Sequence, residues 1–225
     1  MKKLYISIFL LSLSSIIRAQ DSKIQVSSAE KVKFDVYFGA GALFNSDYKL
    51  NQKLVDANMP EIKNVVPELS VGLNAEWLNW SADLELTTSY FKKDNNPLRS
   101  EALSTGLKLR GHYAAYKTQK FLFSAGVDLT YHVNYINLYN RDAHIDLNNL
   151  NPTTQIGSIR LTNEMFYVGP SVAVGLFQHR TTKLRLNAGY EIAAISSRWK
   201  SDYTVVNNTF RENGHDRFYL KLVIM

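Results

Sequence analysis

The residues best placed to do chemistry lie together in the segment Asp142-Ala143-His144-Ile145-Asp146. In an extended segment alternate side chains share a face, so Asp142, His144 and Asp146 would point the same way. Two carboxylates and an imidazole could bind a divalent cation or carry out acid–base catalysis. His215-Asp216 could approach them from a later part of the chain. A solvated loop explains the segment better, and we predict no catalytic, cofactor or metal site.

The elements that would position these residues are strands, because the chain alternates apolar and polar residues over long stretches. Residues Trp80–Tyr90 show the alternation most clearly. Leu84 and Leu86 fall on one face of such a strand, and Asp83 and Glu85 fall on the other. One face is therefore apolar and the other carries charge.

Eight stretches follow this pattern, and most reach the roughly 9–11 residues that a strand needs to cross a membrane. They are Phe34–Phe44, Leu69–Trp77, Trp80–Tyr90, Leu103–Tyr113, Phe121–Tyr135, Phe166–Leu176, Leu184–Ala194 and Phe218–Ile224. We predict an all-β fold, an eight-stranded antiparallel transmembrane up-and-down barrel over residues 33–225.

The second face of these strands carries most of their charged residues. These are Asp35, Glu68, Glu76, Asp83, Glu85, Lys108, Arg110, Asp128, Arg185, Glu191, Arg217 and Lys221. An eight-stranded barrel has an interior only wide enough for side chains to fill it. Buried charges must be paired, so we predict ionic networks across a plugged lumen. His112 and His132 share this face, and we expect both to be satisfied partners in the network.

The connections alternate in length along the chain. Short ones are expected near residues 78–79, 117–120 and 179–182, and long ones over 45–65, 92–101, 138–161 and 197–216. In membrane barrels short turns face the periplasm and long loops face outward. An even number of strands then places both ends of the barrel in the periplasm. Pro170 interrupts one strand, and we expect a local bulge or bend at Gly169-Pro170 because proline cannot donate a ladder hydrogen bond.

The first residues predict a secretory signal peptide over 1–19. Met1-Lys2-Lys3 precede an apolar run over 4–17, and Ala19 supplies the small residue before cleavage. An N-terminal membrane anchor is the alternative, but the run is shorter than the roughly 20 residues of a spanning helix. Residues 20–32 would then form a periplasmic segment. The chain has no cysteine, which excludes a lipoprotein anchor, disulfides and thiolate metal sites.

The charge of the chain does not indicate nucleic acid as a partner. The formal net charge of +6 includes Lys2, Lys3 and Arg18, so that +3 remains after cleavage. No dense basic stripe follows. No later segment has 18 consecutive apolar residues, so we expect no spanning helix. The mean hydropathy of −0.20 suits a barrel, because half of each strand faces the lumen.

The leader at 1–19, the alternating strands Trp80–Tyr90 and Phe121–Tyr135, and the terminal strand 217–225 resemble the small eight-stranded outer-membrane barrels of the OmpA transmembrane domain and OmpX type. The cleavage region and the Asn- and Lys-rich composition resemble the barrels of Bacteroidota. Chains of this type often end in an aromatic residue, whereas this one ends in Met225. The resemblance implies the outer membrane of a Gram-negative cell.

The resemblance covers several functions, since a fold does not by itself choose one. We predict a non-enzymatic role, structural, tethering or partner-binding, through the long loops or the barrel wall. The expected partners are outer-membrane lipids and lipopolysaccharide, which Lys49, Lys53, Lys63, Arg141 and Arg160 would meet. An accessory subunit of a larger outer-membrane machine for assembly, secretion or uptake is one alternative.

Two further alternatives remain open from the sequence. A lipid-A-modifying enzyme would use a histidine with a serine and an acid near the outer rim, but no His-x-Ser motif occurs. A soluble lipocalin-like carrier also has eight antiparallel strands, with apolar residues inside. In that fold Asp83 and Glu85 would face solvent, so the orientation of these two residues distinguishes a carrier from a membrane barrel.

Overall fold

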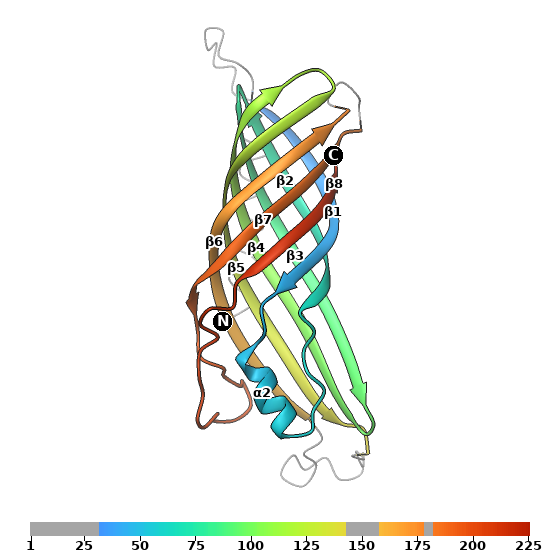
Figure 1. Cartoon of the computed structure of the whole chain (residues 1–225), viewed down its shortest axis with the longest axis vertical. Coiled ribbons are helices and arrows are strands. Elements are labelled where there is room, and N and C mark those ends of the chain that lie inside the picture. The colour runs from blue at the N-terminus through green and yellow to red at the C-terminus, as the bar shows by residue number, and fades with distance from the viewer. Residues whose placement is uncertain (1–31, 143–157, 178–181) are drawn as a thin grey trace, which may run out of the picture. The chain divides into compact units, whose positions relative to one another are not determined.

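Eight antiparallel strands close into a barrel in which each strand pairs with the next and β8 pairs with β1 (Figure 1). The computed structural model describes residues 32–142, 158–177 and 182–225. The strands are β1 (Lys33–Asn45), β2 (Val65–Trp77), β3 (Trp80–Asn95), β4 (Leu98–Lys117), β5 (Phe121–Asn140), β6 (Ser158–Leu176), β7 (Leu184–Ser196) and β8 (Arg217–Ile224). The predicted fold class is confirmed. The signal peptide and most of the segment 20–32 lie outside the described residues.

The long connections gather at one end of the barrel, together with helix α2 (Lys49–Asp56), and the short turns lie at the other end (Figure 1). The connection over 45–65 thus contains a helix. The search for alternating apolar and polar residues, which finds strands, did not predict it. The connection predicted over 92–101 is wrong, because β3 and β4 extend through it and only Asn96-Pro97 separates them. Strands β4 and β5 have 20 residues each, so this hairpin and the end of β5 project beyond the shorter strands.

Of the bulge or bend expected at Gly169-Pro170, the bulge is wrong. Val168 pairs with Ile192 and Ser171 pairs with Gly189, so the register between β6 and β7 is the same on both sides of the proline. The β6–β7 ladder lapses there for two residues, while pairing with β5 continues. The register shifts instead between Phe166 and Tyr167, near the long-connection end. A bulge turns the strand direction at a barrel rim, where it costs few ladder hydrogen bonds.

The two faces of the sheet differ as the alternation predicts. Leu69, Leu86 and Val127 are exposed on the outer wall, whereas Asp83 and Glu85 are buried inside. An apolar outer wall around a charged interior is the reverse of a soluble carrier, so the lipocalin-like alternative is excluded. Within the described residues, no helix is both long and apolar enough to cross a membrane.

Candidate functional site: the sealed lumen and its cap

In the described part of the chain, five buried carboxylates and five buried cations form a continuous network in the lumen, and a further buried cation, Lys183, pairs with Asp35 at the short-turn end. The carboxylates are Glu68, Asp83, Glu85, Asp128 and Glu191, and the cations are Lys108, Arg110, Arg185, Arg217 and Lys221. Equal numbers leave this part of the lumen without net charge. The prediction that ionic networks cross the lumen is confirmed, and paired charged side chains occupy the narrow interior that eight strands enclose.

Arg110 is the centre of the half of the network that lies nearer the short turns. Its Nη1 donates to Asp83 at 2.9 Å, and its Nε donates to Asp128 at 3.1 Å. A third bond runs from Nη2 to the hydroxyl of Tyr219 at 3.0 Å. Arg185 also binds Asp83, from the opposite side of the lumen. One guanidinium therefore ties β4 to β3, β5 and β8.

The other half of the network is organised around Glu191 and Lys221. Glu191 accepts a bond from Arg217 and lies 3.0 Å from the ammonium of Lys108. Lys221 lies 2.5 Å from both Glu68 and Glu85. Each of these carboxylates pairs with a cation from another strand. Detachment of one strand from the barrel would therefore leave buried charges unpaired.

Two lumenal tyrosines fit between these charges because glycine lies opposite each of them. Tyr37 pairs with Gly72, and Tyr219 pairs with Gly189. A Cβ atom on either glycine would lie under 3.0 Å from the tyrosine ring. The phenol groups then reach across the lumen, where Tyr37 donates to Glu85 at 2.9 Å. Glycine here provides room for a ring that connects neighbouring strands.

The two lumenal histidines have different environments. His112 is bonded to the hydroxyls of Ser124 at 3.0 Å and Ser171 at 2.8 Å, so its predicted role in the network is confirmed. The same prediction is wrong for His132, whose two ring nitrogens have no hydrogen-bond partner among the described residues. His132 lines a cavity of about 20 Å³ together with Ser89 and Ser104. That volume suits a single water molecule, which a polar cavity of this kind can hold.

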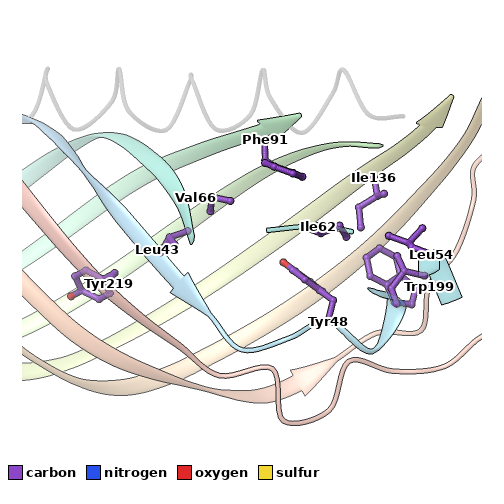
Figure 2. Packing of buried hydrophobic residues seen from close by; sticks show 10 residues of the cluster. Leu43, Tyr48, Leu54, Ile62, Val66, Phe91, Ile136, Trp199 and Tyr219 are labelled. Carbon is purple, nitrogen blue, oxygen red and sulfur yellow. The ribbon is translucent and has the colours of Figure 1, made fainter. Parts of the chain in front are cut away.

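At the long-connection end an apolar cluster closes the barrel mouth, which we call the cap. Helix α2 and the segment 197–216 both contribute to it, with Trp199 beside Leu54 and Tyr48, and the strand ends complete it (Figure 2). The buried members are Leu43, Tyr48, Leu50, Leu54, Ile62, Val66, Phe91, Ile136, Trp199 and Tyr219. Burial of these side chains gives the two connections a fixed conformation.

Both ends of α2 are stabilised by identifiable groups. At the N-terminus Tyr48 gives no side-chain cap, and the buried carboxylate of Glu212 accepts bonds from the backbone N–H groups of Lys49 at 2.8 Å and Leu50 at 3.0 Å. Glu212 also accepts a bond from the indole of Trp199 at 2.8 Å. A carboxylate at this position satisfies orphan N–H groups and complements the helix dipole. At the C-terminus Asn58 has φ of 55°, a left-handed conformation that ends helices.

We expect Glu212→Gln to loosen the cap while leaving the barrel folded. The amide keeps the size of the carboxylate but turns an N–H₂ group toward N–H donors, which should cost about 1–3 kcal/mol of local stability. Trp199 fluorescence reports on the cap in a Trp77→Phe/Trp80→Phe background, where it is the sole tryptophan. A red shift with unchanged far-UV circular dichroism supports the assignment, and an unchanged emission spectrum contradicts it.

His215 holds the segment 197–216 against α2. Its ring lies 3.8 Å from the ring of Tyr48, centroid to centroid, and its Nδ1 is 3.0 Å from the hydroxyl of Tyr167. Burial, and then the nearby charge of Arg217, lowers the pKa of His215 to about 4. Neutral imidazole is therefore the form that the cap accommodates.

A loss of cap stability in acid follows from the lowered pKa of His215. With the cap open, His215 has the ordinary pKa of about 6.5, so the open form takes up a proton first as the pH falls. We expect hydrogen exchange of the α2 amides, corrected for intrinsic rates, to accelerate as the pH falls from about 6.5 toward 4. In His215→Gln this acceleration should be much weaker, and equal pH profiles for the two proteins would contradict the assignment.

The Asp142–Asp146 cluster is not formed by the described residues. His144 and Asp146 lie outside them, and Asp142 is exposed. His215 is buried in the cap, and the carboxylate of Asp216 accepts bonds from Tyr190 and the backbone of Ala193, so both residues already stabilise the fold. No group of three or more His, Asp or Glu side chains that could hold a metal occurs in the described part of the chain.

The sequence reasoning missed a pair of arginines on the cap. Arg198 and Arg211 are joined by an antiparallel bridge, so their side chains share one face, and both are exposed. Neither has an ion-pair partner among the residues described. Like charges placed opposite each other are unfavourable, so this pair suits an external anion. The two arginines are 13 residues apart in a presumed loop, and no sequence pattern relates them.

Several basic residues predicted to meet lipopolysaccharide have neighbours within the chain. The guanidinium of Arg160 donates to Asn137 at 2.6 Å and to Tyr203 at 3.2 Å. Lys53 lies 3.9 Å from Asp56, and Lys63 lies over the ring of Phe91. The side chains of Lys53 and Lys63 nevertheless remain exposed to solvent.

Comparison with known proteins supports the architecture and no more specific family. No protein-family model matches the chain, and no curated protein matches its sequence. The structure of neisserial surface protein A is similar, with 11% identity and a TM-score of 0.52 over 87% of this chain and 97% of that one. The fold is that of the small outer-membrane β-barrels.

A second similar structure is Ail, the attachment invasion locus protein of Yersinia pestis, in complex with the heparin analogue sucrose octasulfate. It has 5% identity and a TM-score of 0.50 over 86% of this chain and 97% of that one. Identity this low shows a shared fold alone. The barrel fold is therefore all that the chain is shown to share with these two proteins, and the role of the cap must be argued from its own residues.

Proposed function

We propose that this chain is a non-enzymatic barrel of the outer membrane that acts at the cell surface through its cap. The observation that carries the proposal is the combination of a filled, charge-balanced lumen with an ordered cap. A filled lumen argues against transport through the barrel, and the apolar outer wall suits a hydrocarbon environment. The cap is then the part that differs from a plain membrane anchor.

The proposed orientation places the cap outside and the short turns, with Val32 and Met225, in the periplasm. Long connections face outward in barrels of this kind, and short turns face the periplasm. An N-terminal signal peptide over 1–19 fits export to this compartment. In intact cells a membrane-impermeant maleimide should label Val205→Cys, at a cap position where the native side chain is 84% exposed, and not Leu78→Cys in a short turn. The opposite labelling pattern would overturn the orientation.

The proposed partners are lipopolysaccharide and a protein at the surface. Arg198 and Arg211 are paired across a backbone bridge and both are exposed, which suits phosphate groups, because arginine binds them through paired N–H bonds. Tyr203 and Val205 expose apolar surface beyond the strands, which favours contact with a protein partner. These features support tethering, either alone or as an accessory subunit of a larger assembly.

Binding of purified lipopolysaccharide tests the anionic partner directly. We expect Arg198→Ser/Arg211→Ser to bind lipopolysaccharide several-fold more weakly than the unmodified protein, with a shallower dependence on salt. Lys117→Ser/Lys120→Ser removes the same charge at the short-turn end and is the matched control. Equal losses in the two double variants would show that only net charge matters and would contradict a site on the cap.

A further inference from the structure

A second feature of the cap region is an apolar groove of about 430 Å³ between α2 and the ends of β4, β5 and β6. Its lining residues include Leu50, Leu54 and Met59 on the side of α2, and Leu138, Ile159 and Leu161 on the side of the strands. Sites for small molecules are typically 300–1,000 Å³ and mostly apolar. The groove is therefore large enough for a ligand, unlike the cavity of about 20 Å³ beside His132.

The groove has rigid walls that do not depend on a ligand. Leu50 and Leu54 are buried members of the cap cluster, and Leu138 and Leu161 pack against that cluster. Helix α2 is fixed by Glu212 at one end, and Asn51 exchanges two hydrogen bonds with the backbone of Ile62. Ile159, in contrast, is 51% exposed in the groove wall. An exposed apolar side chain in a preformed groove offers area that a ligand can bury.

Charge selects among the apolar ligands that would fit. Lys53 is the one charged residue among the described groove-lining residues, and its ammonium makes only a long contact of 3.9 Å with Asp56. Tyr139, Asn140 and Ser158 add neutral polar groups to the lining. A cation at the edge of an apolar groove complements an amphiphile with one negative head group.

From these contacts we propose that the groove binds a long-chain carboxylate, with its hydrocarbon chain along Leu54, Leu138 and Ile159 and its carboxylate at Lys53. This site differs from the pair Arg198 and Arg211, because its walls are apolar and only one cation borders it. It would operate whether or not lipopolysaccharide binds the cap. Helix α2 forms both a groove wall and part of the cap cluster, so occupation of the groove also stabilises the cap.

Binding of cis-parinaric acid, a fluorescent long-chain carboxylate, tests the proposal with the full protein in phosphatidylcholine nanodiscs. Empty nanodiscs give the background from partition into lipid. We expect saturable binding above that background. Ile159→Asp should lose about tenfold or more in affinity, because binding would bury the new carboxylate, unpaired, against the hydrocarbon chain of the ligand. Val55→Asp is the matched control, since Val55 is 52% exposed on the same helix and does not line the groove.

Two more proteins make the outcome decisive. Ala57→Trp fills the groove without adding charge and should also abolish the saturable signal, even if Ile159→Asp fails to fold. Lys53→Gln should weaken binding of the acid but not of its methyl ester. Absence of saturable binding to the unmodified protein overturns the proposal. Binding that Ile159→Asp or Ala57→Trp leaves intact, or that Val55→Asp weakens equally, overturns it as well.

Discussion

Replacing Arg110 with methionine is expected to lower the free energy of unfolding by about 3–5 kcal/mol, the cost of leaving buried charges without their partner. Arg110 bonds Asp83, Asp128 and Tyr219 in the lumen. Arg185 still neutralises Asp83 in the variant. Asp128 keeps hydrogen bonds from Ser171 and Tyr219, but its one remaining cation among the described residues is Lys108, at 3.7 Å. Urea-induced unfolding in lipid vesicles, followed by tryptophan fluorescence, measures the loss.

The matched comparison is the double variant Arg110→Met/Asp128→Asn. It removes a cation and a carboxylate together, so the lumen stays neutral. We expect it to recover a substantial part of the stability that Arg110→Met loses, because the penalty comes from unpaired charge and not from the missing contact alone. A loss below about 1 kcal/mol in the single variant would show that water reaches the lumen and screens its charges.

Replacing Leu84 with arginine is the second large effect, with an expected loss of about 2–4 kcal/mol in lipid. Leu84 lies on the outer face of β3, where its neighbours across the sheet are Leu73 and Leu109. An arginine at this depth would have to keep its charge in hydrocarbon or reach for the interface. Refolding into vesicles over a urea series measures the change in stability.

Asn95→Arg is the control for this substitution. Asn95 ends the same strand at the tip of the β3–β4 hairpin and is exposed. The same side chain should cost little there, because water is available to it. Equal stabilities of Leu84→Arg and Asn95→Arg would mean that Leu84 does not face lipid.

The strands and their faces could be predicted from the sequence because both follow from a period of two. Leu84 and Asp83 lie on opposite faces of β3 and differ in polarity. When the sheet closes into a barrel, Leu84 faces outward and Asp83 faces the lumen. Even the pairing of charges across the lumen follows, since an eight-stranded barrel has no room for hydrated ions. Individual partners, such as Arg110 with Asp83 and Asp128, depend on register and could not be read from the sequence.

The cap could not be predicted because its order comes from contacts between distant segments. Helix α2 has only eight residues, too few for a stable helix in isolation. Glu212 stabilises its N-terminus by accepting a bond from Lys49, 163 residues away. Leu50 and Leu54 have helical spacing, which was the available signal, but they lie in the stretch 45–65 that was predicted only as a long connection. His132 was misjudged for a related reason, since its face was predicted correctly and its neighbours were not.

The extent of the strands was also underestimated. Ser100 belongs to β4 and donates a hydrogen bond to the backbone of Pro60, so the projecting hairpin is anchored to the connection that follows α2. Alternation between apolar and polar residues fades in this region, because both faces contact either water or the cap. The alternation of apolar and polar residues ends where the strands leave the lipid bilayer, whereas backbone hydrogen bonding between the strands continues beyond the bilayer.

The most direct test of the central claim is the accessibility of single spin labels along β3 to oxygen, in lipid bilayers. The chain has no cysteine, so each variant from Ser81→Cys to Ser89→Cys carries one label. Oxygen concentrates in hydrocarbon, and we expect high accessibility at residues 82, 84, 86 and 88 and low accessibility at 83, 85 and 87. The reverse alternation, or equal accessibility throughout, would contradict a barrel with an ionic lumen and a lipid-facing wall.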